Sequence, residues 1–466
     1  MRRAAACFLF LAAGVAAGQT YDLVLRGGRV MDPESGLDAV RDVGISGGVI
    51  RAVSPGRLEG KTVADVSGLV VAPGFIDLHR HGQDPLTYRL QALDGVTSGL
   101  ELEIGTDDVA GWYAAREGKT LVNFGTSVGH PPIRRAVTGD TGRREATPEE
   151  IAEIGRRLDE GLRLGAPTAG FGLAYTPAAS RLEIMEMYRI VARHGAVGHV
   201  HMRSAAGGGS PVEALQEMIA VAAVTGASVQ VVHINSTALK YTREMLEMIE
   251  GARARGLDIT TEAYPYTAGS TSIQAALFDT WIDKPESEYR KLMWTATGER
   301  LTRETFLKYR KTGGRVIVFT NTEDMVDAAI EHPLTMIASD GVGYQDGTGH
   351  PRSAGCYARI LGHYVRGKKS LTLMEALRKM TLAPARRLEH RVPGMRDKGR
   401  IRPGADADIT IFDAATVIDR STYEKPAEPS AGIRHVLVNG TFVVRDARIV
   451  DGAAPGRPIR APILTR

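Results

Sequence analysis

The sequence predicts an α/β protein: a (β/α)8 TIM-like barrel with a small β-sandwich domain built from both chain ends. The middle of the chain alternates short apolar runs with helical periodicity, whereas both ends contain short strand-like segments. A chain of 466 residues is long enough for one large domain and a smaller one. The predicted boundaries are 1–18 for a signal peptide, 19–71 and 400–466 for the β-sandwich, and 72–399 for the barrel.

Eight apolar runs in the middle of the chain are the expected barrel strands. Strands that alternate with helices close into a barrel whose active site lies at the carboxyl ends of the strands. A doubly wound sheet is the structural alternative, but it gives no reason for polar side chains at the ends of so many strands. The expected strands are Phe75–His79, Val96–Ile104, Leu121–Gly129, Gly170–Leu173, Val197–His201, Val229–His233, Ile259–Tyr264 and Leu334–Asp340, with helices such as Pro148–Leu164, Arg181–His194 and Pro211–Thr225 between them.

The two ends of the chain have a different character. Asp22–Arg26 and Val49–Val53 are short strand patterns beside glycine turns, and Ala407–Phe412 alternates apolar and polar side chains. Asn439-Gly440 between two apolar runs is a strong hairpin signal. Two β-rich ends around a long middle predict that the termini meet in one small β-sandwich.

The pattern of the first 18 residues is typical of a signal peptide and predicts that the protein is exported. A short basic start precedes the apolar stretch Ala4–Ala13, and Val15–Gly18 supplies the small residues that a signal peptidase requires. The apolar stretch is too short to span a bilayer comfortably, so we expect no membrane anchor after processing and a periplasmic or secreted protein. Removal of the peptide removes Cys7 and leaves Cys356 alone, so we expect no internal disulfide.

Charge and composition exclude one class of partner. The chain has 58 basic and 54 acidic residues, a net charge of +4, and no basic run interleaved with aromatic residues. Such a pattern argues against nucleic acid as a partner. A small molecule is the expected ligand, and the sequence leaves the oligomeric state open.

His79 and His81, at the end of the first expected strand, indicate a metal site. Side chains alternate along a strand, so a His-x-His pair places both imidazoles on one face. Neutral imidazoles are good ligands for a divalent transition metal. An isolated pair is more often an exposed one, so the interpretation depends on ligand-type residues at the ends of later strands. These are Glu103, His201, His233 and Asp340.

The second expected strand carries two carboxylates on one face, Glu101 and Glu103. A buried carboxylate requires a cation or hydrogen-bond donors, and a pair of metal ions satisfies it. Glu103 lies nearer the strand end and is the predicted ligand bridging two metals, with Glu101 as the alternative. His199, on the fifth strand, is interpreted as a core histidine.

These motifs give the sequence its resemblance to the amidohydrolase superfamily and, within it, to the N-acyl-D-amino-acid deacylases (D-aminoacylases). The resemblance covers nearly the whole mature chain and implies a metal-dependent hydrolase that cleaves N-acyl-D-amino acids to a carboxylate and a free amino acid. The superfamily pattern lies in Ala72–His81, Asp94–Thr97, Ser339–Gly341 and Gly404–Asp408. The deacylase pattern lies in Gly172–Pro177, His201–Arg203, Ala263–Thr271, Gly349–Arg352, Lys379–Ala385 and Val438–Gly440.

The resemblance also implies how the ligands divide. His79, His81 and Asp340 would hold one metal position, and His201 and His233 the other. Family members often use a cysteine or a carboxylated lysine as the bridging ligand, whereas this chain offers a glutamate. Carboxylate oxygen is harder than thiolate, so the relative occupancy of the two positions stays open. We expect one or two Zn²⁺ ions, because such ligands on a hydrolase suit a metal without redox chemistry.

Roles for residues around the metal follow from the same resemblance. Asp340 is the expected general base and acid, which takes a proton from the attacking water and later passes it to the leaving nitrogen. Arg352, expected at the pocket mouth, is the natural partner of a free substrate carboxylate because its planar fork matches two oxygens. Some deacylases have a lysine two residues after His233, where this chain has Asn235. The expected substrate contacts are Arg352, Tyr266, Tyr264, His130, Tyr175 and Asn235.

Three alternative functions stay open. A cyclic amidase of the hydantoinase or dihydroorotase type shares the barrel and metals but usually carries a lysine on the fourth strand, and Ala169–Tyr175 contains none. An exported dipeptidase-like hydrolase is a close neighbour, because dipeptides present the same amide and carboxylate. A non-catalytic binding protein on this scaffold would be expected to have lost ligands, whereas this set is complete.

Overall fold

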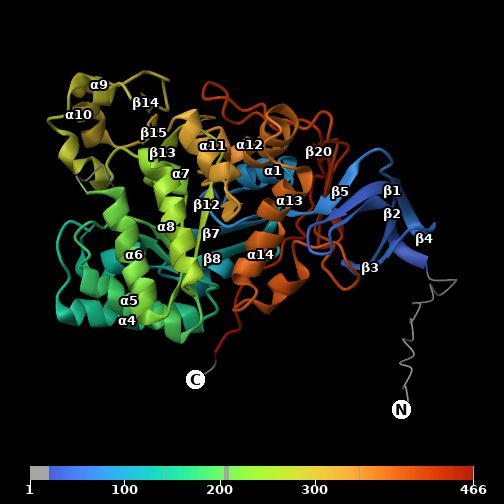
Figure 1. Cartoon of the computed structure of the whole chain (residues 1–466), viewed down its shortest axis with the longest axis horizontal. Coiled ribbons are helices and arrows are strands. Elements are labelled where there is room, and N and C mark those ends of the chain that lie inside the picture. Colours follow the sequence, from blue (N-terminus) through green and yellow to red (C-terminus); the bar gives the residue numbers. More distant parts are fainter. Residues whose placement is uncertain (1–19, 141, 204–208, 346, 465–466) are drawn as a thin grey trace, which may run out of the picture.

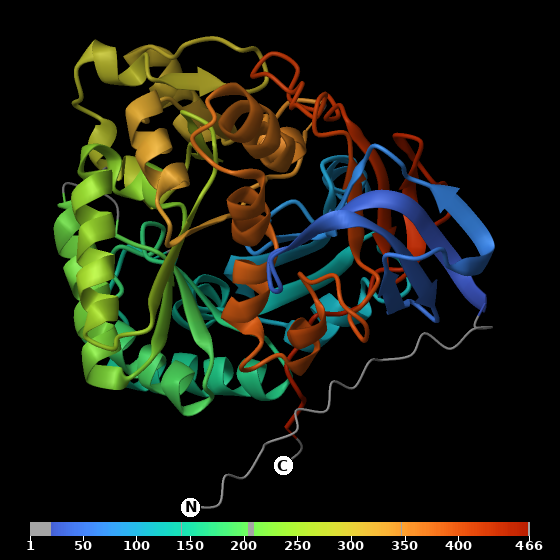
Figure 2. The same ribbon diagram turned by 45° about the vertical axis from the view of Figure 1, so that its right-hand side comes forward.

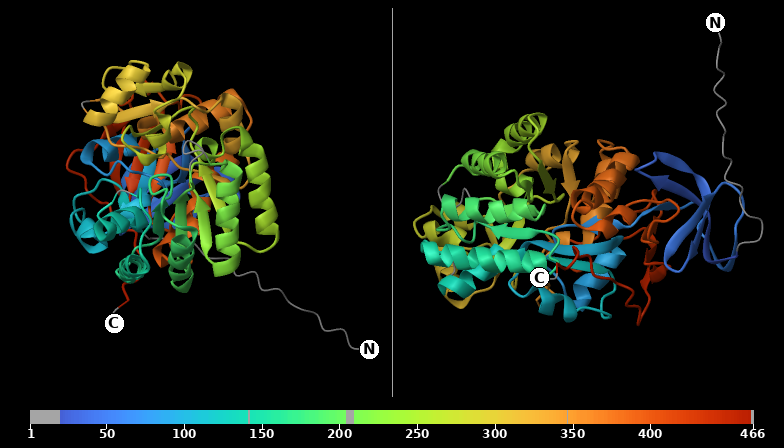
Figure 3. Two further views of the ribbon diagram at one scale, coloured as in Figure 1. Left: turned by 90° about the vertical axis from the view of Figure 1, so that its left-hand side faces the viewer. Right: turned by 90° about the horizontal axis from the view of Figure 1, so that it is seen from below.

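The computed structural model describes residues 20–140, 142–203, 209–345 and 347–464 (Figure 1). A barrel forms the larger part, and a β-sheet domain lies at one side of it as a separate lobe, which the view from below in Figure 3 shows most clearly. The expected signal peptide, residues 1–18, lies outside the described residues. Within the described ranges, no helix combines the length and apolar character needed to cross a bilayer.

The barrel is an eight-stranded parallel sheet whose strand order follows the chain. Its seam, between the first and last strands, is closed by a bridge between Arg80 and Gly341, where the His81 N–H also donates to the Gly341 carbonyl at 2.8 Å. All eight strands coincide with the expected apolar runs, so the barrel prediction is confirmed. The strands are β6 (Phe75–Asp77), β7 (Val96–Thr106), β8 (Asn123–Gly129), β9 (Ala169–Gly172), β10 (Val197–His201), β11 (Ser228–Val231), β12 (Ile259–Ala263) and β16 (Thr335–Ile337).

Helices cover the outside of the barrel (Figure 2). Local sequence fixes their ends: α4 begins after Thr147, whose side chain accepts from the Glu150 N–H in a capping box, with Pro148 at the first helical position. The helices are α1 (Pro85–Leu93), α2 (Val109–Ala114), α3 (His130–Thr138), α4 (Pro148–Arg163), α5 (Arg181–Arg193), α6 (Pro211–Thr225), α7 (Ile234–Thr237), η2 (Leu239–Tyr241), α8 (Thr242–Ala254), α11 (Glu323–Glu331), α12 (Arg352–Arg359) with its continuation η4 (Ile360–Gly367), α13 (Leu373–Met380), α14 (Leu382–Leu388) and η5 (Pro393–Asp397).

The β domain is one nine-stranded, mainly antiparallel sheet that contains strands from both chain ends. The central strand β5 pairs with β1 from the N-terminal part and with β17 from the C-terminal part, which joins the two ends directly. Its apolar face includes Leu25, Val43 and Ile409, all buried. The strands are β1 (Thr20–Asp32), β2 (Leu37–Ser46), β3 (Val49–Ser54), β4 (Glu59–Asp65), β5 (Val70–Pro73), β17 (Ile409–Phe412), β18 (Ile433–Val438), β19 (Thr441–Arg445) and β20 (Arg448–Ile449).

A third, three-stranded sheet interrupts the barrel between β12 and β16, and the sequence did not predict it. Its strand order is β13-β15-β14, and it has a small aromatic core of its own that includes Phe278, Trp281, Tyr289 and Phe306. We call residues 269–318 the insertion; it lies at the top left of Figure 1. Its elements are β13 (Gly269–Ser272), η3 (Ala276–Trp281), α9 (Glu286–Tyr289), β14 (Leu292–Trp294), α10 (Arg303–Thr312) and β15 (Arg315–Val318).

Candidate metal centre

The six residues expected to bind metal lie together at the carboxyl ends of five barrel strands. His79 and His81 follow β6, Glu103 lies in β7, His201 ends β10, and His233 and Asp340 follow β11 and β16. They form two groups of potential ligands that share Glu103. The groups are His79, His81, Glu103 and Asp340, and Glu103, His201 and His233.

The first group surrounds one point. The Nε2 atoms of His79 and His81 are 3.2 Å apart, and Glu103 Oε2 lies 2.6 and 3.1 Å from them. Asp340 Oδ1 lies 3.4 and 3.3 Å from the same two nitrogens. Ligands of a tetrahedral ion at about 2.1 Å would be about 3.4 Å apart, so most of these separations fit an ion of that size. The donor set, imidazole nitrogen and carboxylate oxygen, suits zinc-type metals.

The second group lies against the other oxygen of Glu103. Glu103 Oε1 is 3.0 Å from His201 Nδ1, and the rings of His201 and His233 meet edge to face at 4.5 Å. The buried Nδ1 of His233 has no hydrogen-bond partner among the described residues, which leaves its lone pair available. Glu103 therefore presents one oxygen to each group, the arrangement expected of a bridging carboxylate.

Two backbone turns direct these side chains inward. His233 and Asp340 have φ values of 33° and 49°, in the left-handed region that residues other than glycine rarely adopt. Such a conformation costs about 1–2 kcal/mol per residue and persists where the surrounding structure holds it. Both residues lie just beyond the end of a barrel strand, and both contribute a side chain to the ligand cluster.

Carboxylates behind the ligands fix the two imidazole rings of the first group. His79 Nδ1 is 2.7 Å from Glu262 Oε1, and Gln230 Nε2 donates to the other oxygen of Glu262 at 3.0 Å. His81 Nδ1 is 2.5 Å from Glu101 Oε2. A carboxylate on the far nitrogen sets the tautomer that leaves Nε2 free for a metal. Glu101 thus lies behind His81 and outside both ligand groups, while Glu103 occupies the bridging position.

Glu262 was not found from the sequence. It is a carboxylate in an expected barrel strand, as Glu101 and Glu103 are, but two threonines in Ile259–Ala263 make its position in a buried strand less evident from the sequence. Burial raises its pKa, and the contact with His79 partly offsets that rise.

Electrostatics within the cluster favour a cation. Burial alone lowers the pKa of His79, but the carboxylates of Asp340 and Glu103 outweigh it and raise that pKa to about 10. Burial also opposes ionisation of Glu103 and Asp340, yet the neighbouring histidines, and for Asp340 the Arg352 guanidinium, hold both pKa values below the usual range. Two buried carboxylates that stay ionised among imidazoles create a strong demand for positive charge, which a metal supplies.

Two cavities open beside the cluster and share Tyr175, Ser270, Thr271 and Asp340. The narrow cavity, about 130 Å³, reaches His201 and His233 and has an apolar wall of Leu277, Phe278, Trp281 and Val318. The wide cavity, about 740 Å³, reaches His81 and Glu101, and its lining includes Arg135, Arg143, Arg310 and Arg315. The insertion provides much of both walls.

The expected substrate contacts divide into two sets. Tyr175 lines both cavities and Tyr264 lines the narrow one, and the Tyr264 hydroxyl is buried without a hydrogen-bond partner among the described residues. The other side chains are directed elsewhere: His130 Nε2 lies 2.8 Å from Glu183, the Tyr266 hydroxyl donates to Asp419 at 3.2 Å, and Asn235 Nδ2 donates to the Tyr264 carbonyl at 3.2 Å. None of these last three lines either cavity.

Arg352 does not lie at the pocket mouth, where the sequence placed it. It begins α12, its side chain is fully buried, and its Nη2 forms an ion pair with Asp340 Oδ2 at 2.8 Å. The guanidinium stacks on the Tyr264 ring at 4.5 Å. Packing of α12 against the barrel end draws Arg352 inward, which the sequence around it does not reveal.

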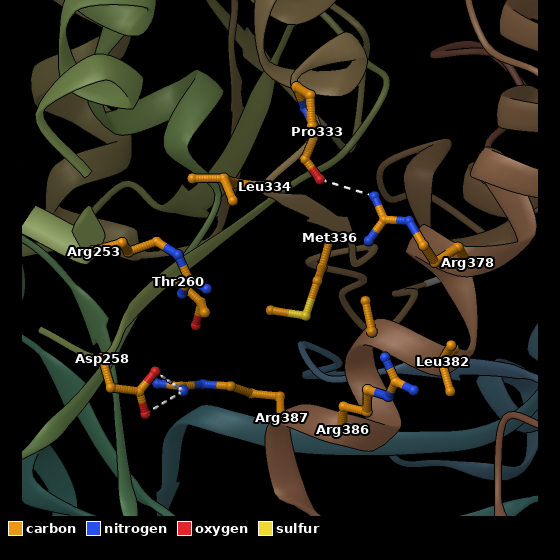
Figure 4. Close-up of a pocket in the computed structure, with 11 residues that line it drawn as sticks. Arg253, Asp258, Thr260, Pro333, Leu334, Met336, Arg378, Leu382, Arg386 and Arg387 are labelled. Atoms are coloured by element: carbon orange, nitrogen blue, oxygen red, sulfur yellow. Dashed lines mark hydrogen bonds and ion pairs between the residues drawn. The ribbon is translucent and has the colours of Figure 1, made fainter. Parts of the chain in front are cut away.

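A further cavity, of about 300 Å³, lies away from the ligand cluster (Figure 4). Its lining includes Thr260 and Met336, from β12 and β16, and four arginines. Arg387 donates to both carboxylate oxygens of Asp258 at 2.7 Å, and Arg378 donates to the Pro333 carbonyl at 2.9 Å. The guanidinium groups of these two arginines are thus already bound to other parts of the protein.

Comparison with known proteins agrees with this geometry. The amidohydrolase family profile matches residues 62–444. The N-acyl-D-glutamate deacylase of Alcaligenes xylosoxydans xylosoxydans is 33% identical over 94% of this chain and 96% of its own length. The crystal structure of N-acyl-D-glutamate deacylase from Bordetella bronchiseptica, complexed with zinc and a phosphonate inhibitor, superposes with a TM-score of 0.84 at 28% identity, covering 95% of this chain and 100% of that one.

A structure of D-aminoacylase that addresses the role of its binuclear metal centre superposes with a TM-score of 0.81 at 28% identity, and covers 95% of this chain and 100% of that one. Both the family profile and the relative at 33% identity extend over most of the chain, and the residues matched by the profile include all six clustered residues. The chain belongs to the amidohydrolase family, in the branch that contains the D-aminoacylases, and is a metal-binding hydrolase of linear amides.

Proposed function

We propose that this protein hydrolyses the amide bond of N-acyl-D-amino acids to a carboxylate and a free D-amino acid. The observation that carries the proposal is the ligand cluster around Glu103, which opens into cavities large enough for a small acylated amino acid. The deacylase names of relatives that match over nearly the whole chain support this substrate class.

The chain's own residues would hold the metal and move the proton. His79, His81 and Asp340 would bind one ion, His201 and His233 the other, and Glu103 both. When bound, the metal lowers the pKa of a coordinated water toward neutrality and polarises the scissile carbonyl. We propose zinc at one or both positions, supported by the donor set and by the zinc in the related Bordetella structure.

Asp340 is the proposed general base and acid. Its carboxylate stays ionised beside the ligands, so it can accept a proton from the attacking water as the new C–O bond forms. It then passes that proton to the amide nitrogen as the C–N bond breaks, which releases the amine. Tyr264 is the proposed donor to the carbonyl oxygen, because its hydroxyl lies at the cavity wall and has no hydrogen-bond partner among the described residues.

Arg352 is the proposed partner of the substrate α-carboxylate. Its Nε and Nη1 are buried and have no hydrogen-bond partner among the described residues, which leaves N–H donors of the guanidinium available. The α-carboxylate is one carbon from the scissile nitrogen, so a partner that also contacts Asp340 is suitably placed. We further propose export to the periplasm or the medium, on the signal-peptide pattern of residues 1–18.

The test is a panel of matched substrates with the zinc-loaded protein. N-acetyl-D- and N-acetyl-L-amino acids, dipeptides and cyclic amides such as hydantoin should be compared by kcat/KM. The proposal expects turnover of the N-acyl-D-amino acids above all other classes. Preference for dipeptides or for hydantoin would replace it with a dipeptidase or a cyclic amidase, and the absence of a lysine in β9 argues against the latter.

A further inference from the structure

Arg315 is a half-buried cation at the wall of the wide cavity. It begins β15 and lines that cavity together with Tyr175 and Asp340. Its backbone is fixed on both sides, because it pairs with Ser272 of β13 and its carbonyl accepts hydrogen bonds from Thr295 N and Oγ1 at 3.3 and 3.1 Å. The guanidinium itself forms no hydrogen bond or ion pair within the described ranges of the chain. A fixed backbone that presents an unpaired charge is organised for a ligand in advance.

The other arginines of this cavity differ from Arg315. Arg143 Nε lies 2.7 Å from Asp279, and Arg310 binds the same carboxylate and also donates to the carbonyls of Ile273 and Ala275 at 2.9 and 3.0 Å. Arg135 is exposed to solvent at the end of α3. Among the described arginines of this lining, Arg315 thus combines partial burial with the lack of a direct hydrogen-bond or ion-pair partner.

The charges and the burial around Arg315 also favour binding of an anion. Burial lowers the pKa of Arg315 and the positive charge of Arg352 lowers it further, and these two effects outweigh the opposing influence of Tyr175 and of the Asp340 carboxylate. The net effect disfavours the charged form of Arg315, and an anion bound at the guanidinium would favour that form. Keeping a partly desolvated cation without a partner costs free energy, which a ligand that supplies the opposite charge recovers.

We propose that Arg315 binds a second carboxylate of the substrate, so that the preferred N-acyl-D-amino acids carry two negative groups. This inference rests on the hydrolysis proposed above, in which Arg352 takes the α-carboxylate. The second carboxylate can belong to an acidic amino-acid side chain or to a dicarboxylic acyl group. In both cases the shared chemistry is two carboxylate oxygens against the planar fork of a guanidinium.

Two matched pairs of substrates distinguish these sources in the zinc-loaded protein. N-acetyl-D-glutamate against N-acetyl-D-glutamine tests the side chain, and N-succinyl-D-leucine against its succinamoyl counterpart tests the acyl group. Each pair exchanges one carboxylate for an amide of nearly the same shape. We expect kcat/KM to favour the carboxylate in one pair by about tenfold to hundredfold, the effect of a charged hydrogen bond.

Arg315→Met should reduce that preference to within about threefold and leave the amide member nearly unchanged, because the change removes only a charge interaction. Arg135→Met is the matched control: it removes an exposed arginine from the same cavity and should leave the preference intact. Should Arg315→Met fail to fold, Arg315→Lys keeps a charge without the planar fork and should lower the preference by about tenfold.

Three results would overturn the proposal. The parent protein could hydrolyse the carboxylate and amide members of both pairs with equal kcat/KM, which would exclude a second carboxylate site and leave the proposed function intact. Arg315→Met could lower both members equally, which would assign Arg315 a structural role, or Arg315→Lys could keep the preference in full. A parent protein that hydrolyses no member of either pair would instead contradict the proposed function itself.

Discussion

The guanidinium of Arg352 lies 2.8 Å from the Asp340 carboxylate, and both side chains are buried against the ligand cluster. This ion pair joins the residue proposed to bind the substrate carboxylate to the residue proposed to move the proton. The Arg352 charge contributes to holding the pKa of Asp340 low, against the effect of burial. Substrate binding at Arg352 would therefore alter the electrostatic environment of the general base directly.

Asp340→Asn should preserve the fold and abolish most turnover, because an amide cannot accept and return the proton. We expect kcat to fall by roughly 10²–10⁴, the usual contribution of general acid–base catalysis. Steady-state kinetics with N-acetyl-D-amino acids measures the loss, and metal content measured in parallel separates proton transfer from ligand loss. Turnover within about tenfold of the parent would exclude this role.

Arg352→Lys should mainly raise KM for N-acyl amino acids, since lysine keeps the charge beside Asp340 but loses the bidentate fork. Binding that acts equally on ground state and transition state changes KM and not kcat. The matched control is the substrate α-amide, which lacks the carboxylate and should be hydrolysed almost as well by the variant as by the parent. Equal losses on carboxylate and amide substrates would show that Arg352 is structural.

Removal of the metal should become easier as the pH falls. The carboxylates of Asp340 and Glu103 raise the pKa of His79 to about 10 over the opposing effect of burial. A proton must therefore leave His79 when metal binds, so each pH unit lowered should weaken binding by about tenfold per displaced proton. Chelator titrations at pH 6, 7 and 8, followed by elemental analysis, measure this slope, and a flat profile would contradict it. The melting temperature should fall as the metal leaves.

Glu262→Gln should weaken metal binding while the barrel stays folded. The carboxylate lies 2.7 Å from His79 Nδ1 and fixes the ring whose Nε2 faces the metal position. Loss of such a partner costs roughly 10–100-fold in metal affinity or activity. Chelator competition gives the affinity, and excess metal in the assay should restore much of the activity. Failure of added metal to rescue, together with a parent-like affinity, would assign Glu262 to the barrel core instead.

The barrel and the ligand cluster could be predicted because their signals are local. Each barrel strand is an apolar run, and each ligand stands at or just beyond its end, so the order of strands alone brings His79, Glu103, His201 and Asp340 together. The choice between Glu101 and Glu103 was harder. The ladder between β7 and β8 changes register after Glu101, and only the folded strand shows which carboxylate lies behind His81.

Residues around the substrate were harder to place, because their directions depend on packing between distant segments. His130 and Tyr266 were expected to contact the substrate, yet they bind the carboxylates of Glu183 and Asp419 instead. The insertion escaped prediction because its strands have only three or four residues and pair mostly across intervening helices. Arg315 could not be identified as a candidate without it.

The insertion also has a consequence for how proteins of this kind diversify. Its core of Phe278, Trp281, Tyr289 and Phe306 is formed from its own residues, whereas every clustered ligand comes from a barrel strand end. Mutations in the insertion can accumulate or be exchanged between paralogues without moving the catalytic atoms. The range of compounds hydrolysed can then change while the reaction chemistry stays intact, and a laboratory library confined to residues 269–318 could follow the same route.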